Sequence, residues 1–226
     1  MGAAGPTGAA VLELVAVMDR LRLPGGCPWD REQTSQSLAR YLLEETYEVL
    51  EALDSGDRKH LREELGDLLL QVVFHARLAE EHPDDPWDID DVARGIVDKL
   101  VSRHPHVFDD AEAGGADDLR AFDVEASWER QKAAEKRRVS LLDGIPAAMP
   151  ALARADKVLA RVERSGLDVA PAGEAEPFGD RLLALVAQAR AAGVDSEAAL
   201  RRATVDLATR VAAAESRPEN GSTLQA

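Results

Sequence analysis

The segment YLLEETYEVLEAL, Tyr41 to Leu53, places a glutamate where the apolar face of a helix should be continuous. At about 100° per residue, one helical face collects the side chains of Leu38, Tyr41, Leu42, Val49, Ala52 and Leu53. Glu45 falls in the middle of this face, and Glu48 and Glu44 fall progressively toward its edge. A carboxylate at a core-facing position is unfavourable unless another group compensates its charge. The segment therefore predicts a helix whose carboxylates need a partner from elsewhere in the fold.

The segment from Leu61 to about Glu81 repeats this anomaly. Its apolar residues form two arcs, one of Leu61, Leu65, Leu68, Leu69, Val72 and Ala76, and one of Leu70, Phe74 and Leu78. A polar stripe runs between the arcs and consists of Glu64, Asp67, Gln71 and His75. The pattern predicts a helix buried on two sides, with carboxylates between them. The short connection DSGDRKH predicts antiparallel packing of the two helices, which would bring Glu45 and Glu48 opposite Glu64 and Asp67.

Carboxylates grouped in this way point to a divalent cation. They cannot all remain ionised at close range without cations, and hard oxygen ligands with no Cys or His at matching spacing suit Mg²⁺ or Mn²⁺. A di-iron centre is disfavoured because its Glu-x-x-His spacing is absent from the sequence. The competing interpretation is that the glutamates are solvated surface residues, which is the usual role of such residues on helices.

The remaining ordered segments also have helical periodicity, and runs of alternating β-branched residues are missing. Besides the acidic helices at residues 37–53 and 61–81, we expect helices at 11–21, from 88–91 to 103, and at 119–139. The segments LPGGCPWD and HPDDP are expected to interrupt them. The sequence therefore predicts an all-α helical bundle. His75, in a helix interior, is expected to be a core histidine with its hydrogen bonds satisfied.

Composition narrows the classes of partner. The 226 residues carry a formal net charge of −15, which argues against a surface that binds a nucleic-acid polymer. It does not argue against binding of a single nucleotide, because metal ions can contact the phosphates of that nucleotide. The single cysteine, Cys27, excludes an intramolecular disulfide and indicates a reducing compartment. No segment approaches the roughly 20 apolar residues of a membrane span, and the N-terminus lacks a basic leader. We therefore expect a cytoplasmic protein that does not associate with membranes.

Four blocks of the sequence together resemble the MazG family of nucleoside triphosphate pyrophosphohydrolases. The first is the acidic pattern itself, Glu-Glu-x-x-Glu at Glu44, Glu45 and Glu48 within YLLEETYEVLEAL. The others are GCPWDREQTSQSL (26–38), LREELGDLLLQVVFHA (61–76), which carries Glu-x-x-Asp at Glu64 and Asp67, and DKLVSRHPHVF (98–108). The resemblance covers about residues 11–150.

The resemblance implies an all-α fold that dimerises and hydrolyses nucleoside triphosphates to the monophosphate and pyrophosphate. Carried over by motif position, the implied Mg²⁺ ligands are Glu45, Glu48, Glu64 and Asp67. Glu44 lies beside them and is expected to orient water or the outer ligand shell.

The resemblance also implies which residues contact the nucleotide. Lys99 and Arg103, one helical turn apart, would contact the phosphates, and Trp128 and Lys132 form a second such pair at the nucleotide. Tyr41, one turn before Glu45, is a further candidate. Without the resemblance, the basic pair would be assigned to a solvent-facing surface and Trp128 to the core.

The second half of the chain carries a partial echo of the first. Glu64 to Arg77 (ELGDLLLQVVFHAR) and Pro177 to Arg190 (PFGDRLLALVAQAR) match at Gly-Asp, two leucines, Val and Ala-Arg. Pro177 replaces Glu64, so only Asp180 remains of the acidic pair, and Asp206 stands where a phosphate-binding lysine is expected. We therefore expect a flexible N-terminus at 1–10, a catalytic domain at 11–150, a degenerate helical repeat at 151–215 and a disordered tail at 216–226.

Two hypotheses about function follow. The first is a Mg²⁺-dependent nucleoside triphosphate pyrophosphohydrolase that removes non-standard or oxidised nucleotides. The second is a catalytically weak helical module that senses nucleotides or binds proteins, an alternative raised by the degraded second half. Nucleotide binding without pyrophosphate release would distinguish the second from the first.

Overall fold

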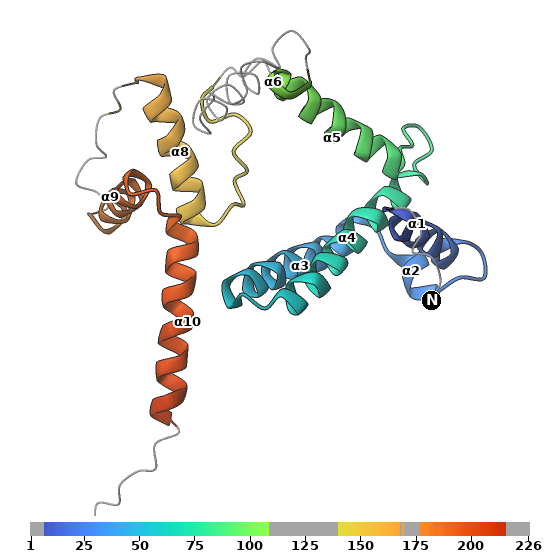
Figure 1. Cartoon of the computed structure of the whole chain (residues 1–226), viewed down its shortest axis with the longest axis horizontal. Helices are drawn as coiled ribbons and strands as arrows, with labels where there is room; N and C mark the ends of the chain where they lie inside the picture. Colours follow the sequence, from blue (N-terminus) through green and yellow to red (C-terminus); the bar gives the residue numbers. More distant parts are fainter. Residues whose placement is uncertain (1–6, 109–139, 168, 170–176, 216–226) are drawn as a thin grey trace, which may run out of the picture. The chain divides into compact units, whose positions relative to one another are not determined.

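The computed structural model describes residues 7–108, 140–167, 169 and 177–215. Every regular element within these ranges is a helix, and none of them is a strand (Figure 1). The predicted all-α fold is therefore confirmed. None of the described helices is long and apolar enough to cross a bilayer.

The chain divides into two compact units, Met1–Glu129 and Arg130–Ala226. The division falls between residues 109 and 139, outside the described ranges, so the domain limits expected from the sequence stay predictions. The helix expected at 119–139 and the tail expected at 216–226 also lie outside the described residues.

The first unit contains six described helices, α1 (Ala9–Arg22), α2 (Pro28–Glu32), α3 (Ser35–Ser55), α4 (Arg58–Ala79), α5 (Ile89–Arg103) and α6 (Pro105–Phe108). Four of them, α1, α3, α4 and α5, correspond to predicted helices. The short α2 was not predicted, and it forms inside a Pro/Gly-rich connection because Pro28 occupies the first helical position, where a missing N–H is harmless.

The helices α3 and α4 form an antiparallel hairpin whose ends are set by local hydrogen bonds. Thr34 and Ser37 make a capping box at the start of α3: Ser37 N–H donates to Thr34 Oγ1 at 3.1 Å, and Thr34 N–H donates to Ser37 Oγ at 2.9 Å. Gly56 ends α3 in the left-handed region, with φ 72°. Asp57 then caps α4 by accepting from the N–H groups of Lys59 and His60 at 2.8 and 3.2 Å. A two-residue connection, Gly56 and Asp57, therefore fixes the pairing of the two helices.

The buried core lies where α1 crosses the hairpin. Met18, Leu38, Val73 and Phe74 are at most 3% exposed, and they come from α1, α3 and α4. Side chains that pack around them include Tyr41 and Leu70. The core therefore occupies the part of the hairpin that contains the start of α3 and the second half of α4.

Two arginines tie α1 to the C-terminal end of α4. Arg22 is 8% exposed; its Nε and Nη2 donate to the two carboxylate oxygens of Glu81 at 2.9 and 2.7 Å, and its Nη1 donates to the carbonyl of Asp30. Its guanidinium also lies 5.6 Å from the ring centroid of Phe74. Arg77 on α4 donates to Asp19 at 2.7 Å. These bonds place the end of α4 against α1.

The sequence predicted that α4 is buried on two sides, and this is wrong for the single chain. The arc containing Phe74 faces the core, but Leu65, Leu69 and Val72 of the other arc are 49%, 37% and 39% exposed. Apolar side chains of α3 are also exposed, among them Leu42, Leu43, Tyr47 and Leu53. Within the described part of the first unit, no element covers these positions, so the hairpin presents an apolar surface to its surroundings.

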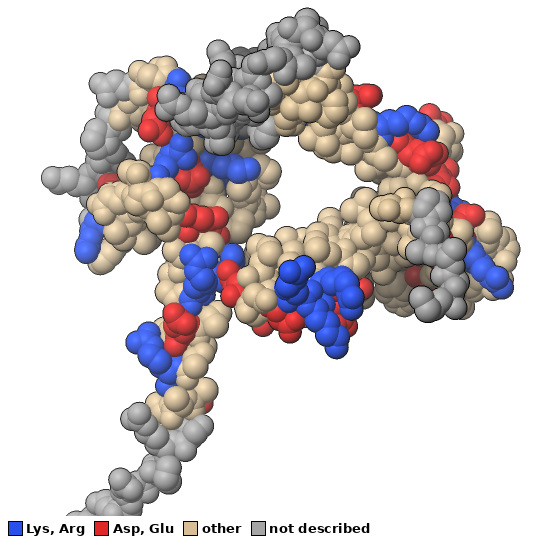
Figure 2. Space-filling view, viewed as in Figure 1, with Lys and Arg blue, Asp and Glu red and all other residues tan. Residues whose placement is uncertain are grey.

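The hairpin surface also carries charges of both signs. Figure 2 shows Lys and Arg atoms beside Asp and Glu atoms over α3 and α4. The visible face of the hairpin is therefore a mixed-charge surface and not a continuous acidic or basic field.

The second unit contains α8 (Ala151–Ser165), α9 (Pro177–Ala191) and α10 (Ser196–Glu215). The echo segment forms α9, as the periodicity predicted. Arg190 at its C-terminal end pairs with Glu163 of α8 at 3.0 Å. In this unit Asp180 of the echo motif has no second helix carrying Glu-Glu-x-x-Glu beside it, because that part of the motif is missing from the sequence.

Candidate metal centre

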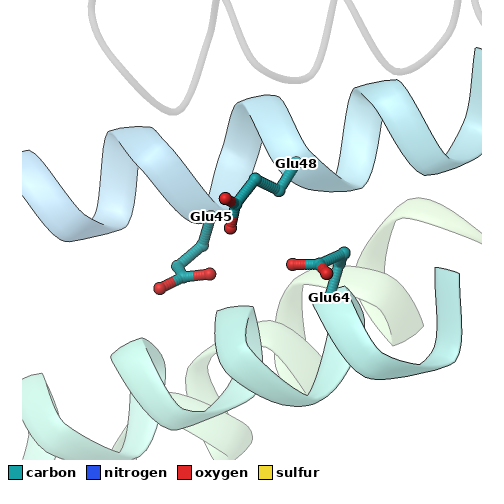
Figure 3. Close-up of side chains that lie close together, drawn as sticks. All are labelled: Glu45, Glu48 and Glu64. Carbon is teal, nitrogen blue, oxygen red and sulfur yellow. The ribbon is translucent and has the colours of Figure 1, made fainter. Parts of the chain in front are cut away.

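Three carboxylates meet between α3 and α4. Glu45 and Glu48 project from α3 toward Glu64 on α4 (Figure 3). One oxygen from each lies within 4.8 Å of the others. The antiparallel hairpin predicted from the sequence is therefore observed, and it brings together three of the four expected metal ligands.

Burial and mutual repulsion both act on these carboxylates. Glu64 is 8% exposed, and Glu45 and Glu48 are half-buried. Desolvation raises the pKa of Glu45, and the charges of Asp67 and Glu48 raise it further. Desolvation also raises the pKa of Glu64, and the charge of Glu48 adds to this effect. The ionised cluster is thus unfavourable in the protein alone, as expected where positive charge is missing.

His60 on α4 contacts Glu64, and sequence reasoning missed this pair. Its Nε2 lies 3.0 Å from Glu64 Oε1, and its charge opposes the rise in the pKa of Glu64. The i, i+4 spacing of His60 and Glu64 on a helix was a signal that could have identified the pair.

Asp67 and Glu44 lie beside the cluster without joining it. Asp67 is exposed and is not one of the three carboxylates within 4.8 Å of one another, although its charge raises the pKa of Glu45. Glu44 is exposed on α3. The roles predicted for Asp67 as a ligand and for Glu44 in orienting water stay predictions.

The residues expected at the nucleotide are distributed over several elements. Tyr41 is half-buried and packs against the core. Its ring and that of Trp29 form a T-shaped pair with centroids 6.0 Å apart, and the guanidinium of Arg40 lies 4.5 Å from the centroid of Tyr41. Lys99 is exposed and Arg103 is half-buried, both on α5. Their charges are not among the causes that shift the pKa of Glu45 or Glu64. Trp128 and Lys132 lie outside the described residues.

The expectation for His75 needs correction. Its Nε2 is buried and has no hydrogen-bond partner among the described residues, so this histidine is not satisfied. Gln71, one turn earlier on α4, is 5% exposed, and its Oε1 is unpartnered in the same way. The polar stripe of α4 therefore extends from the carboxylates into the protein interior, where Gln71 Oε1 and His75 Nε2 lack hydrogen-bond partners among the described residues.

The donor set of the cluster fits a divalent cation. All ligand atoms available from Glu45, Glu48 and Glu64 are carboxylate oxygens, which Mg²⁺ and Mn²⁺ prefer. A bound cation would offset the repulsion that raises the pKa of Glu45 and Glu64. The three carboxylates can therefore hold a divalent cation through their oxygen atoms.

Comparisons with known proteins place the three carboxylates within a matched domain. Residues 33–108, which include all three carboxylates, match the MazG nucleotide pyrophosphohydrolase domain. An uncharacterised protein of Streptomyces cacaoi is 50% identical over 197 residues, covering 87% of this chain and 78% of its own. The nucleoside triphosphate pyrophosphohydrolase of Escherichia coli K12 is 41% identical over 220 residues, covering 84% of this chain and 81% of its own.

A third relative is longer than this chain. The nucleoside triphosphate pyrophosphohydrolase of Mycobacterium tuberculosis is 44% identical over 208 residues, which cover 92% of this chain but 59% of the relative. The chain belongs to the MazG family of nucleotide pyrophosphohydrolases. The family resemblance deduced from the four sequence blocks is therefore confirmed.

Proposed function

We propose that this chain hydrolyses nucleoside triphosphates to the monophosphate and pyrophosphate, using Mg²⁺ or Mn²⁺ held by Glu45, Glu48, Glu64 and Asp67. The observation that carries the proposal is the meeting of three carboxylates from α3 and α4 within 4.8 Å. The names of the relatives from M. tuberculosis, E. coli and Thermotoga maritima, each a nucleoside triphosphate pyrophosphohydrolase, support the reaction.

Each group of the chain has a distinct task in this reaction. Water attacks the α-phosphorus, the bond from that phosphorus to the bridging oxygen breaks, and pyrophosphate leaves with the β- and γ-phosphates. A divalent cation, when bound, supplies positive charge to the triphosphate and lowers the pKa of a coordinated water. The carboxylates of α3 and α4 hold that charge in place, and Glu44 orients the attacking water. Lys99 and Arg103 contact the phosphates, while Tyr41, Trp128 and Lys132 contact the nucleotide.

The proposed substrates include damaged nucleotides. An enzyme that cleaves triphosphates of non-standard or oxidised nucleosides keeps them from being used for synthesis, and the proposed chemistry acts on the phosphates that all of these compounds share. The ranking of substrates therefore has to be measured and is part of the test below.

The proposed active form is a homodimer. The apolar residues that α3 and α4 leave exposed, including Leu65, Leu69 and Val72, lie on the hairpin that carries the carboxylates. Covering them with a second copy would bury apolar surface from both chains. A four-helix arrangement of two hairpins is the simplest way to do so.

The test is pyrophosphate release from a panel of standard and oxidised ribo- and deoxyribonucleoside triphosphates with Mg²⁺. Wild type is compared with Glu45→Gln, which keeps the side-chain shape but removes the charge, and with Glu51→Gln, which makes the same change at an exposed position of α3. We expect release by wild type and Glu51→Gln, and at least a hundredfold loss in Glu45→Gln. Asp180→Asn in the second unit should leave the rate unchanged. Nucleotide binding without release by wild type would contradict the proposal and favour a sensing or protein-binding module.

A further inference from the structure

The polar stripe of α4 continues beyond the carboxylates into a region that is otherwise apolar. Gln71 is 5% exposed, and three of the next five residues, Val73, Phe74 and Ala76, are at most 3% exposed. The Oε1 atom of Gln71 and the Nε2 atom of His75 are both buried without a hydrogen-bond partner among the described residues. Unpaired buried polar atoms destabilise a fold, because they have lost water and gained nothing in return.

Stability alone would favour an apolar side chain at position 71. The echo helix α9 provides a comparison within the chain: aligned on Gly66-Asp67 and Gly179-Asp180, the position of Gln71 is Ala184 and that of His75 is Gln188. The unpaired glutamine thus occurs in the copy that has the carboxylate cluster, and alanine occurs in the copy that lacks it. A polar group retained at a cost to stability, next to a site, indicates a role in that site.

The position of Gln71 suits contact with the nucleoside part of a substrate. Along α4, Gln71 lies one turn, about 6 Å, beyond Asp67, and His75 lies one further turn away. The charge of Asp67 acts on Glu45, so the antiparallel hairpin sets the turn of α3 that carries Tyr41 opposite the turn of α4 that carries Gln71. A nucleoside attached to an α-phosphate at the cluster would extend along the hairpin in one of its two directions. The direction toward Tyr41 and Gln71 leads to the unpaired polar atoms, whereas the other leads to the exposed Gly56 turn.

We propose that Gln71 is a specificity-determining residue that hydrogen-bonds the sugar or base of the nucleoside triphosphate, with Nε2 of His75 as a second contact. This inference rests on the proposed function. A side-chain amide offers both a donor and an acceptor, so it distinguishes substrates by their hydroxyl and amino groups and not by their charge. A site that hydrogen-bonds its substrate discriminates strongly against analogues that lack the group, because its own polar atoms are then left unpaired.

The decisive variant is Gln71→Met, which keeps the length and volume of the side chain and removes its polar atoms. Three quantities are measured on the full chain: the free energy of unfolding, the affinity for Mn²⁺, and kcat/KM for ribo- and deoxyribonucleoside triphosphates of each base. We expect stability equal to or above that of wild type, unchanged Mn²⁺ affinity, and a loss of kcat/KM of about tenfold or more that differs between substrates. Gln36→Met, at an exposed position of α3, is the matched control and should change none of the three.

The pattern of losses identifies the contact and can overturn the inference. A loss confined to ribonucleotides identifies a sugar hydroxyl, and a loss that follows the base identifies a base edge; either supports the proposal. Unchanged kcat/KM for every substrate, or an equal loss for all of them together with lower stability, overturns it and assigns Gln71 a structural role. If wild type releases no pyrophosphate from any nucleotide, the proposed function fails and this inference fails with it. An active wild type with an unaffected Gln71→Met overturns this inference alone.

Discussion

Glu64 is well placed to bind a metal ion, although its ionised form is unfavourable in the protein alone. It is buried between two helices, its pKa is raised first by desolvation and then by the charge of Glu48, and His60 at 3.0 Å offsets only part of this. The same features that oppose an ionised glutamate in the protein alone favour a bound divalent cation. We therefore expect the stability of the metal-free protein and its affinity for metal to respond in opposite directions to removal of one carboxylate.

The pH dependence of stability tests this directly. Because the pKa of Glu45 is higher in the folded than in the unfolded chain, the folded state binds more protons between these two values, and the contribution of Glu45 to stability is lost as pH rises through them. In the presence of EDTA, Glu45→Gln should be more stable than wild type at about pH 7 by a few tenths of a kcal/mol, since a half-exposed carboxylate is screened by water. The difference should shrink toward about pH 4.

Urea unfolding of both proteins across this pH range provides the measurement, with Glu51→Gln as the control for loss of a charge on α3. Adding Mg²⁺ should reverse the order, because wild type is stabilised by its ligand. If, without metal, wild type became more stable than Glu45→Gln as pH rises, the ionised form of Glu45 would not destabilise the fold. That result would contradict the prediction.

Among the helices, Arg22 is the more deeply buried of the two arginines that join α1 to the end of α4. Replacing Arg22 with Ala removes the paired bonds to Glu81, the bond to the Asp30 carbonyl and the contact with Phe74 together. We expect a loss of about 2 kcal/mol in the free energy of unfolding. Arg94→Ala is the matched control: Arg94 pairs with Asp90 and Asp91 on α5 but is 64% exposed in its side chain, so its loss should stay within about 0.5 kcal/mol.

Denaturant unfolding of the two variants, followed by circular dichroism, measures both values. Equal losses would show that the buried geometry of Arg22 adds nothing to a surface ion pair. The pair with Glu81 should also weaken in acid: the hydrogen bond from Arg22 lowers the pKa of Glu81, so its contribution is lost as pH falls through that value.

How far the sequence predicted these elements depends on how local their causes are. The bounds of α3 and α4 follow from periodicity and from caps within a few residues, such as Thr34 with Ser37 and Asp57 with His60, so they could be predicted. The meeting of Glu45 with Glu64 followed from a short turn. By contrast, the exposure of Leu65 and the missing hydrogen-bond partners of Gln71 and His75 depend on which surfaces are covered in three dimensions. Periodicity in the sequence does not specify this.

At the level of the whole molecule, the apolar surface of the hairpin is the feature that a single chain leaves unexplained. Leu65, Leu69 and Val72 repeat at helical spacing on the side of α4 away from the core. Surface of this kind, on the same helices as the carboxylates, makes self-association the expected state.

Leu65→Arg tests this expectation, because it places a charge at the most exposed residue of the arc formed by Leu65, Leu69 and Val72. We expect the dimer dissociation constant to rise at least tenfold, about 1.4 kcal/mol, when measured by analytical ultracentrifugation. Leu12→Arg on α1, at a leucine that is 68% exposed, is the control and should leave association unchanged. A wild type that sediments as a monomer at all concentrations would contradict the homodimer.

The two-residue connection at Gly56 and Asp57 has a kinetic consequence. The carboxylates from α3 and α4 are neighbours along the chain, so closing the hairpin costs little loop entropy, and the site is expected to form before α1 docks on the core. If the hairpin closes first, the carboxylates of α3 and α4 come close to one another in the transition state for folding, where their repulsion slows the reaction. A divalent cation should consequently act on the refolding rate, accelerating hairpin closure, while the unfolding rate of the chain changes little.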